Sequence, residues 1–203
     1  SVGELERAIL AGVEPQKIIF EGIGKTKEDI AFALEKNIRL INVESIDELK
    51  RVNKVAIYQN KIINIGIRLN PNIDGQTLEK ISTGKKTDKF GIDTDKLNEV
   101  FQILEVCKSV NLIGISCHVG SQIFNINVFA EIFKKMKSNA QIFLNKGYDI
   151  KHVDLGGGLG VNYHQNQEIL NLQLVKKEMD KCYIDVPYKL SYEPGRYLVA
   201  KAG

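Results

Sequence analysis

Short apolar runs alternate with segments of helical periodicity along the whole chain. Six runs have the length and composition of strands, at residues 18–20, 38–43, 62–69, 112–117, 150–155 and 188–192. Between them, apolar residues recur at spacings of three and four, which is typical of helices that bury one face. Largely apolar strands that alternate with helices indicate an α/β protein, with a parallel sheet and helices outside it.

Capping signals set the expected helix boundaries. A first helix is predicted over residues 3–11, because Gly12 stops it, and a late helix is predicted around residues 168–181. Ser45 and Glu48 have the spacing of a capping box at the start of another helix. Further N-caps are predicted at Thr26, at Asp93 or Thr94, and at Asn127.

Two sheet architectures agree with this order of elements. One is an open doubly wound sheet, and the other is a (β/α)₈ TIM-like barrel of which this chain holds six strands. The chain has no GxGxxG motif after an early strand, and its polar motifs follow late strands, where barrels place phosphate sites. We therefore predict the barrel, as one partial domain over residues 1–203 that lacks the first two strands. The polar connection over residues 70–89 is long for a compact domain, which indicates a functional loop.

Composition excludes several classes of function. Of the 203 residues, 43% are hydrophobic and 26% are charged, and the net charge of +3 arises from interspersed lysines and acids. The chain has no basic stripe of the kind that binds nucleic acid, and no apolar run of the roughly 20 residues that a membrane span needs. Cys107, Cys117 and Cys182 lie in apolar surroundings, which predicts reduced thiols in a cytoplasmic protein rather than disulfides or a metal site.

The strand expected at residues 150–155 ends in three consecutive glycines, Gly156, Gly157 and Gly158. Glycines cost backbone entropy on folding, so a cluster of them indicates positive φ angles or close backbone packing. Backbone N–H groups that point into one concavity form a nest that binds phosphate. An ordinary tight turn is the alternative, and the triplet by itself does not decide between them.

A second turn follows the next strand and joins an acid to a base, in Glu193, Pro194, Gly195 and Arg196. Proline followed by glycine predicts a type II turn that fixes both side chains. A carboxylate can keep a heterocycle nitrogen protonated, and a guanidinium can bind a carboxylate or a phosphate through two hydrogen bonds. A surface salt bridge between the two side chains is the alternative interpretation.

Other polar residues stand at strand ends. His118 follows the strand at residues 112–117 and precedes a small turn with Gly120 and Ser121, which favours a ligand-binding role. Arg68 ends an earlier strand, where it either ties the mouth of the barrel together or contacts a ligand. His152 and His164 lie in polar surroundings, and we assign them no role. A phosphate-binding turn, a ring-facing histidine and an acid for a pyridine nitrogen are together the equipment of a pyridoxal-phosphate site.

Seven segments carry a resemblance to a known family. They are residues 1–5 (SVGEL), 68–71 (RLNP), 80–84 (KISTG), 89–92 (KFGI), 118–122 (HVGSQ), 154–160 (DLGGGLG) and 193–196 (EPGR). From end to end of the chain they resemble the alanine-racemase-like, fold-type III decarboxylases, which use pyridoxal 5′-phosphate. Within these, HVGSQ and GGGLG are more similar to the diaminopimelate decarboxylase branch than to the ornithine branch.

This resemblance implies roles for the residues of the turns. His118 would stack on the pyridine ring and Glu193 would pair with the pyridine nitrogen, so these two are the implied catalytic residues. Arg196 would meet a substrate carboxylate. The implied phosphate pocket is lined by Ser121, Gly156, Gly157, Gly158, Glu193, Pro194, Gly195 and Arg196.

The resemblance also implies a reaction and an assembly. The reaction is loss of CO₂ from meso-diaminopimelate to give L-lysine, the last step of lysine biosynthesis, by a homodimer whose second, β-rich domain completes the substrate pocket. The family's cofactor-binding lysine ends the first barrel strand, which we expect before Ser1. No lysine in this sequence shows the desolvated setting of a nucleophile; Lys36, for example, follows an amphipathic helix. We therefore expect the 203-residue chain by itself to be inactive.

Alternative functions stay open at this point. A decarboxylase of ornithine, arginine or carboxynorspermidine has the same parts, and a pyridoxal-phosphate-binding barrel without turnover or another phosphate-binding barrel is also possible. One departure from the family concerns the KISTG segment, which is often preceded by a histidine. Here Leu78 and Glu79 occupy that place, which puts the contacts of this loop in question.

Overall fold

The computed structural model describes residues 1–75, 90–163 and 169–202. In chain order its elements are α1 (Val2–Leu10), η1 (Pro15–Lys17), β1 (Ile19–Phe20), α2 (Lys27–Glu35), β2 (Leu40–Val43), α3 (Ile46–Tyr58), β3 (Ile63–Asn70), β4 (Ile92–Asp93), η3 (Thr94–Lys96), α4 (Leu97–Val106), β5 (Val110–Cys117), α5 (Ile126–Asn145), β6 (His152–Asp154), α6 (Leu172–Cys182), β7 (Lys189–Ser191) and α7 (Gly195–Val199). These strands form one sheet in the order β1-β2-β3-β5-β6-β7, with β4 beside the end of β3, and all of the pairings are parallel.

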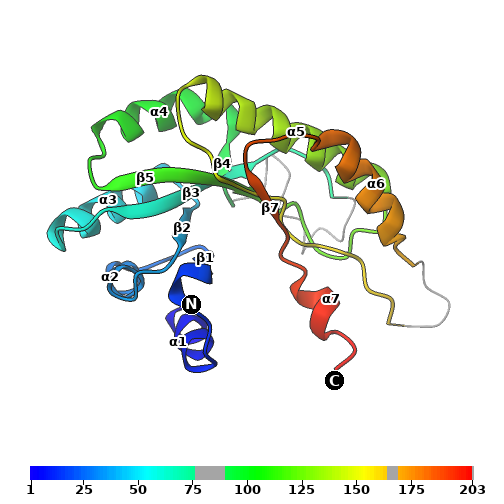
Figure 1. Ribbon diagram of the computed structural model, residues 1–203, viewed down its shortest axis with the longest axis horizontal. Helices are drawn as coiled ribbons and strands as arrows, with labels where there is room; N and C mark the ends of the chain where they lie inside the picture. The colour runs from blue at the N-terminus through cyan, green and yellow to red at the C-terminus, as the bar shows by residue number, and fades with distance from the viewer. Residues whose placement is uncertain (76–89, 164–168, 203) are drawn as a thin grey trace.

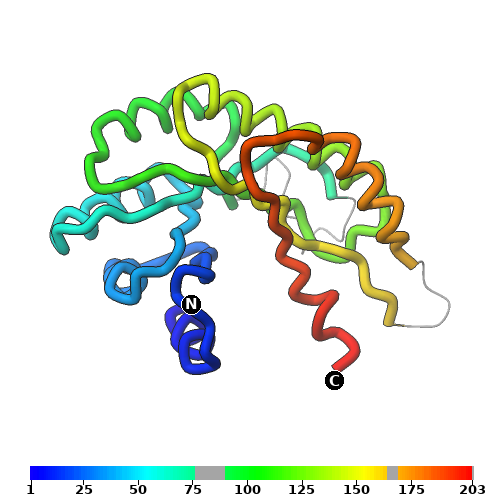
Figure 2. Tube along the Cα trace, in the orientation of Figure 1, coloured from blue at the N-terminus to red at the C-terminus, as the bar shows by residue number. Residues whose placement is uncertain are grey.

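The sheet curves into an arch that is half of a barrel (Figure 1). Helices α4, α5 and α6 lie over its convex side, and both ends of the chain lie toward its open side. The chain follows the arch from one limb to the other, so that each strand–helix unit lies beside the next (Figure 2). This curvature confirms the predicted barrel class over the open doubly wound sheet.

The two faces of the sheet differ in polarity. Ile65, Ile67 and Leu69 of β3 are almost fully buried in the hydrophobic core. Side chains alternate between the faces of a strand, so the intervening positions point to the concave side. Four polar residues at such positions are aligned by the register in one row across four strands: Arg68, Ser116, Asp154 and Ser191. The concave face therefore carries charge and hydrogen-bonding groups inside an otherwise apolar fold.

Several predicted helix ends are confirmed. The Thr26 side chain accepts from the Asp29 N–H and Asp29 reaches back to the Thr26 N–H, which completes a capping box. Ser45 caps α3 by accepting from the Glu48 N–H at 3.1 Å. The predicted capping box also requires the Glu48 carboxylate to accept from the Ser45 N–H. That part of the prediction is wrong, because the Glu48 carboxylate accepts from the Glu44 N–H at 2.7 Å.

Other boundaries differ from the prediction. The N-cap of α5 is Asn125, whose side chain accepts from the Asn127 N–H, so that helix begins before the predicted cap. A 3₁₀ turn, η3, follows Asp93, and neither Asp93 nor Lys96 makes a side-chain cap hydrogen bond. Asp93 instead belongs to the additional strand β4, which pairs with β3. A two-residue strand is too short to leave a periodic signal in the sequence.

The predicted type II turn at residues 193–196 is also wrong. That turn needs a positive φ at Gly195, but Gly195 is the first residue of helix α7 and has no positive φ. Pro194 stands at the N-cap with φ −80° and ψ 41°, and its carbonyl accepts from the Leu198 N–H at 3.0 Å. The φ that proline imposes suits the start of a helix as well as a turn.

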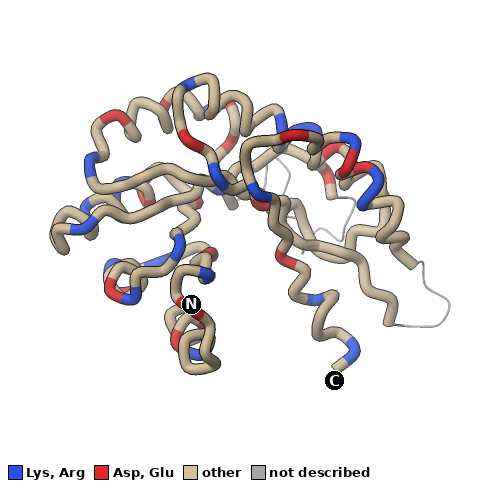
Figure 3. The backbone as a smooth tube through the Cα atoms, viewed as in Figure 1, with Lys and Arg blue, Asp and Glu red and all other residues tan. Residues whose placement is uncertain are grey.

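Charges and thiols follow the sequence expectations. Lys and Arg alternate with Asp and Glu along the helices and do not form a basic stripe on the described chain (Figure 3). Cys107 and Cys117 are buried, Cys182 is half-buried, and all three are free thiols. Among the described helices, none has the length and hydropathy to cross a bilayer.

Candidate active site

Three strands bring the predicted site residues together at their carboxyl ends. His118 directly follows β5, Gly156 and Gly157 follow β6, and Glu193 follows β7. The Gly157 N–H donates to His118 Nδ1 at 3.2 Å, and the Glu193 N–H donates to the Gly156 carbonyl at 2.9 Å. The glycine turn therefore lies between the histidine and the glutamate, and contacts both.

The three glycines are required by close backbone packing. A Cβ atom at Gly156 would lie 2.3 Å from the Cys117 carbonyl oxygen, and one at Gly157 would lie 2.1 Å from the Glu193 carbonyl oxygen. At Gly158 it would lie 2.2 Å from the Gly120 carbonyl oxygen. Gly156 and Gly158 also have φ angles of +73° and +87°, which L side chains rarely adopt. Any side chain here would separate the ends of neighbouring strands.

The N–H groups of the glycine turn are not equivalent. The Gly156 N–H donates to Asp154 Oδ1 at 2.7 Å, and the Gly157 N–H is taken by His118. In the described part of the chain, the Gly158 N–H meets no acceptor. The turn is thus held by protein acceptors at two positions and offers a donor to a ligand at the third.

Arg196 supplies a positive charge beside this turn. Its Nε donates to Ser121 Oγ at 3.1 Å and its Nη1 donates to the Tyr163 hydroxyl at 3.1 Å. Neither Glu193 nor any other carboxylate of residues 1–75, 90–163 and 169–202 forms an ion pair with it. The guanidinium is oriented by neutral groups, and its charge remains available to an anion. The alternative of a salt bridge within residues 193–196 is thereby excluded.

Glu193 has a pKa raised to about 9, chiefly because neighbouring protein removes water from its carboxyl group. The charges of Glu21 and Asp154 and a hydrogen bond with Glu21 act in the same direction, while Arg68 opposes them. Glu21 follows β1 at the far edge of the sheet and accepts a hydrogen bond from Asn42. At neutral pH Glu193 therefore carries a proton, which it can donate to a ring nitrogen.

His118 shows the opposite shift. Burial and then the positive charge of Arg68 lower its pKa to about 4, against a smaller opposing effect of Asp154. A neutral imidazole is what the contact with Gly157 requires, because Nδ1 must be an acceptor. A neutral ring can also stack on a flat heterocycle.

Arg68 and Lys25 have structural partners. Arg68 Nη1 lies 3.1 Å from Glu44 Oε1, which favours the interpretation that it ties the barrel mouth together. Lys25 is only 3% exposed, so the expectation that no lysine is desolvated is wrong. Its ammonium donates to the carbonyls of Gly22 and Asn42 and lies 3.2 Å from Glu48 Oε1, which leaves no free pair for nucleophilic attack.

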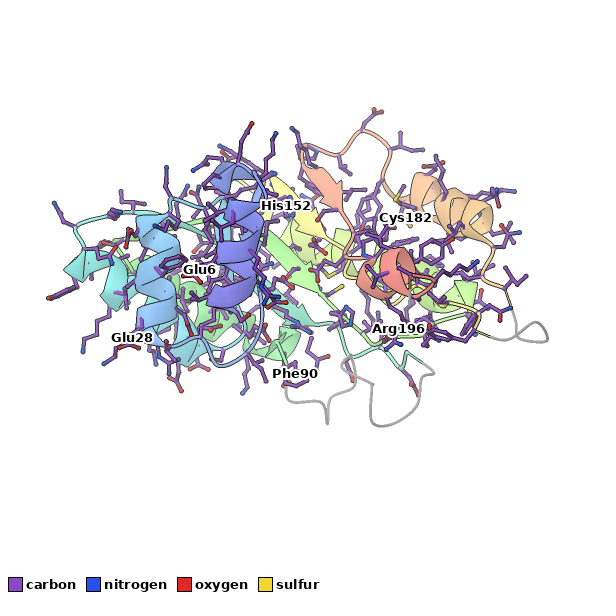
Figure 4. The ribbon with its side chains drawn as sticks, turned by 90° about the horizontal axis from the view of Figure 1, so that it is seen from below. Glu6, Glu28, Phe90, His152, Cys182 and Arg196 are labelled. Carbon is purple, nitrogen blue, oxygen red and sulfur yellow. The ribbon has the colours of Figure 1, made fainter. Side chains whose placement is uncertain are left out.

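Sequence reasoning missed the polar side chains within the strands. Asp154 and His152 are 3% and 4% exposed, so His152 is not in the polar surroundings predicted for it. The sequence signal that could have found them is the alternation of His152 and Asp154 with the apolar Val153 within a buried strand. Figure 4 shows Phe90 and Arg196 toward the carboxyl end of the sheet, with His152 further back. Residues 78–84, Lys89 and His164 lie outside the described residues.

The site offers each kind of group that pyridoxal phosphate needs. Arg196 and Ser121 present cationic and hydroxyl donors for a phosphate, beside the Gly158 N–H, which has no acceptor within the described chain. Glu193 presents a protonated carboxyl for a pyridine nitrogen, and His118 a neutral ring for its face. These residues fit the group.

A family model described as "Pyridoxal-dependent decarboxylase, pyridoxal binding domain" matches residues 1–200. The chain belongs to this family. The matched part of the pyridoxal-dependent decarboxylases is the one that holds the cofactor, so the cofactor here is pyridoxal phosphate. The predicted resemblance and cofactor are confirmed.

Three similar proteins are named diaminopimelate decarboxylase. Diaminopimelate decarboxylase of Pseudomonas aeruginosa is 38% identical over 203 residues, covering 100% of this chain and 49% of the relative. The Helicobacter pylori enzyme complexed with L-lysine has 35% identity and a TM-score of 0.94, covering 99% of this chain and 51% of that one. The Methanocaldococcus jannaschii enzyme in complex with L-lysine has 36% identity and a TM-score of 0.85, covering 98% and 47%. The chain thus spans about half the length of the relatives it matches.

Proposed function

We propose that the protein is a diaminopimelate decarboxylase, which removes CO₂ from meso-2,6-diaminopimelate and forms L-lysine. The proposal is carried by likeness to proteins of this name over the whole chain, at 38% identity for one and a TM-score of 0.94 for another. The meeting of His118, the glycine turn and Glu193 at one end of the sheet supports the pyridoxal-phosphate part of the proposal independently, because these residues fit that cofactor.

The residues of this chain act mainly by binding and by holding protons. Bound pyridoxal phosphate supplies an electron sink for the electron pair that remains when CO₂ leaves. We assign Glu193 the role of holding a proton toward the ring nitrogen, for which its raised pKa suits it. His118, kept neutral and anchored to the Gly157 N–H, presents a ring face that orients the cofactor.

Anion recognition is assigned to the other turn residues. Ser121, the Gly158 N–H and the start of α7, with Pro194 and Gly195, would bind the phosphate. Arg196 contributes the positive charge, to the phosphate or to a carboxylate of the substrate, since no carboxylate of the described chain neutralises it. Gly156 and Gly157 would act through their shape, because their N–H groups are already bonded within the protein.

We further propose that the protein is a cytoplasmic homodimer whose only ligands are the cofactor and an amino-acid substrate. The free thiols support a reducing compartment. Leu198 and Val199, beside Arg196 on α7, are 73% and 65% exposed, which suits a surface covered in an assembly. Light scattering of the purified complete protein should give the mass of two subunits.

The assay that tests the function uses the complete protein with pyridoxal phosphate. CO₂ release and L-lysine formation from meso-diaminopimelate are the expected results. Release from ornithine, arginine or carboxynorspermidine, but not from meso-diaminopimelate, would assign one of the other decarboxylases. Cofactor binding with no CO₂ from any of these amino acids would show a non-catalytic barrel.

A further inference from the structure

Three polar side chains on the concave face form a hydrogen-bonded chain behind the glycine turn. His152 Nε2 lies 3.0 Å from Ser191 Oγ, and Ser191 Oγ donates to Asp154 Oδ2. His152 and Asp154 are almost completely buried, and they come from β6 while Ser191 comes from β7. None of the three has a role in the proposed function so far.

The single hydrogen of the serine hydroxyl decides which group donates in each of these two hydrogen bonds. A serine hydroxyl has one hydrogen, and here it goes to the Asp154 carboxylate, which can only accept. The hydrogen between His152 and Ser191 must therefore come from His152 Nε2. His152 Nε2 is 3.9 Å from Asp154 Oδ2, too far for a direct hydrogen bond, so the serine is the link between them.

Asp154 is ionised despite its burial. Burial by itself raises its pKa, but His152, the Ser191 hydroxyl and the Gly156 N–H together outweigh that effect, and the pKa is lowered. An ionised carboxylate accepts stronger hydrogen bonds than a neutral one. The Ser191 hydroxyl, itself held by His152, thus helps to keep Asp154 in the ionised form that accepts from the turn.

The other end of the chain is the turn itself. Asp154 Oδ1 accepts from the Gly156 N–H at 2.7 Å, and the Gly156 carbonyl accepts from the Glu193 N–H at 2.9 Å. The Leu155 N–H donates to the Ser191 carbonyl at 3.0 Å, which fixes the two strand ends to each other. The position of Gly156 is therefore determined on both sides, and with it the direction of the Gly158 N–H two residues later.

Backbone packing leaves room for His152. Gly114 is its register partner in β5, and a Cβ atom there would lie 3.1 Å from the His152 carbonyl oxygen and 3.4 Å from the His152 Cβ. A glycine at this position lets the histidine lie against β5.

We propose that His152, Ser191 and Asp154 are positioning residues, which hold the glycine turn in the geometry that binds a phosphate monoester. The inference rests on the proposed function, because it takes residues 156–158 as part of the cofactor's phosphate site. The three residues act through the turn and touch neither the cofactor nor the substrate.

The test compares two ligands that lack an aldehyde, pyridoxine 5′-phosphate and pyridoxine, by calorimetry on the cofactor-free complete protein. For Ser191→Ala and His152→Leu we expect affinity for the phosphate ester to fall about tenfold, as for one lost hydrogen bond, with affinity for pyridoxine unchanged. Ser191→Thr and His152→Gln keep the hydroxyl and an amide N–H donor. These two should stay within about threefold of the wild type for the phosphate ester.

Tyr192→Phe is the matched control. It removes a hydroxyl from the next residue, whose partner is the Met179 sulfur at 3.3 Å, away from the turn. It should change neither affinity. Equal losses for both ligands, or no loss for the phosphate ester in Ser191→Ala, would overturn the positioning role.

A spectroscopic measurement tests the same inference in case the leucine variant does not fold. Imidazole ¹⁵N shifts of the wild-type protein should show a hydrogen on His152 Nε2, and an unprotonated Nε2 would contradict the proposed direction. Failure of the proposed function would look different, because it would appear as no CO₂ release from meso-diaminopimelate by wild-type protein. Wild-type protein that binds pyridoxine 5′-phosphate no better than pyridoxine would contradict the phosphate site on which the positioning role depends.

Discussion

Two titratable side chains of the site have pKa values shifted in opposite directions, and each shift depends on residues from other strands. His118, after β5, is held neutral by burial and by Arg68 of β3. Glu193, after β7, is held protonated by loss of water and by Glu21, which follows β1. A ring that stays neutral and an acid that keeps its proton are two different environments held side by side at one site.

The titration of His118 can be measured directly. In the cofactor-free protein, NMR of the imidazole should give a midpoint near 4, compared with the ordinary value of 6.5. As the pH falls below 6.5, the unfolded chain takes up this proton before the folded chain does. The contribution of His118 to the stability of the fold is therefore complete above pH 6.5 and is lost as the pH falls toward 4. His118→Asn, which keeps an acceptor for Gly157, should weaken this pH dependence. A midpoint at 6.5 would show that His118 is not desolvated.

Arg196→Lys should lower kcat/KM on meso-diaminopimelate by about tenfold to a hundredfold. The guanidinium donates from Nε to Ser121 and from Nη1 to Tyr163, and a lysine ammonium cannot keep this planar, two-sided arrangement. Arg51→Lys is the control, since Arg51 donates to the Lys25 carbonyl, away from the site. An unchanged kcat/KM in Arg196→Lys would remove Arg196 from substrate and phosphate recognition.

At the residue scale, sequence reasoning succeeded where a residue stands directly after a strand. His118 and Glu193 were found in this way, and the structure places both at the predicted end of the sheet. Glu21 was missed because its effect on Glu193 requires the two limbs of the arch to face each other. Asp154 and Ser191 were missed because their hydrogen bond depends on the register between β6 and β7.

Among the elements, the glycine turn is the one whose sequence is most constrained. Its three glycines pack against backbone carbonyls of Cys117, Gly120 and Glu193, which cannot move as a flexible side chain could. The triplet alone did not distinguish a phosphate nest from a tight turn. The structure shows a tight turn whose first two N–H groups are bonded within the protein, while the Gly158 N–H has no acceptor among the described residues and is left for the proposed phosphate contact.

Gly157→Ala should destabilise the protein by about 1–3 kcal/mol and weaken pyridoxal-phosphate binding, as overpacking does elsewhere. Its Cβ would lie 2.1 Å from the Glu193 carbonyl oxygen and would push β6 and β7 apart. Gly3→Ala is the control, because a Cβ there meets nothing within 4 Å and alanine favours the helix. Chemical denaturation should show Gly3→Ala at least as stable as the wild type. Equal stability of Gly157→Ala and wild type would show that the strand ends are not closely packed.

Helix ends were predictable where the signal is local. The cap at Thr26 depends on residues within three positions, and the structure has it. The cap at Asn127 was placed two residues late because Asn125 and Asn127 are equally suitable in sequence. A turn was predicted for residues 193–196 because the Pro-Gly pair is common in turns as well as at helix starts. The helix is recognised from the hydrogen bond that the Leu198 N–H donates to the Pro194 carbonyl.

For the whole molecule, the order of strands and helices was enough to predict a parallel barrel-like sheet. The curvature of the arch has a consequence that periodicity does not contain. It brings Glu21 and Glu193, at opposite edges of the sheet, near enough across the concave side for Glu21 to raise the pKa of Glu193. The polar row of Arg68, Ser116, Asp154 and Ser191 lines this same side, so the arch surrounds the site with charge that its apolar outer layer does not reveal.

The most direct test of the proposed function is the turnover of Glu193→Ala in the complete protein with saturating pyridoxal phosphate. If Glu193 holds the proton that faces the ring nitrogen, kcat on meso-diaminopimelate should fall by about 10²–10⁴-fold. Cofactor affinity should change far less, because the phosphate contacts of the other turn residues remain. Glu193→Gln, which keeps the size of the side chain, should lose turnover as well. A kcat of Glu193→Ala within about a factor of two of the wild type would contradict the role of Glu193 and the arrangement of the site proposed around it.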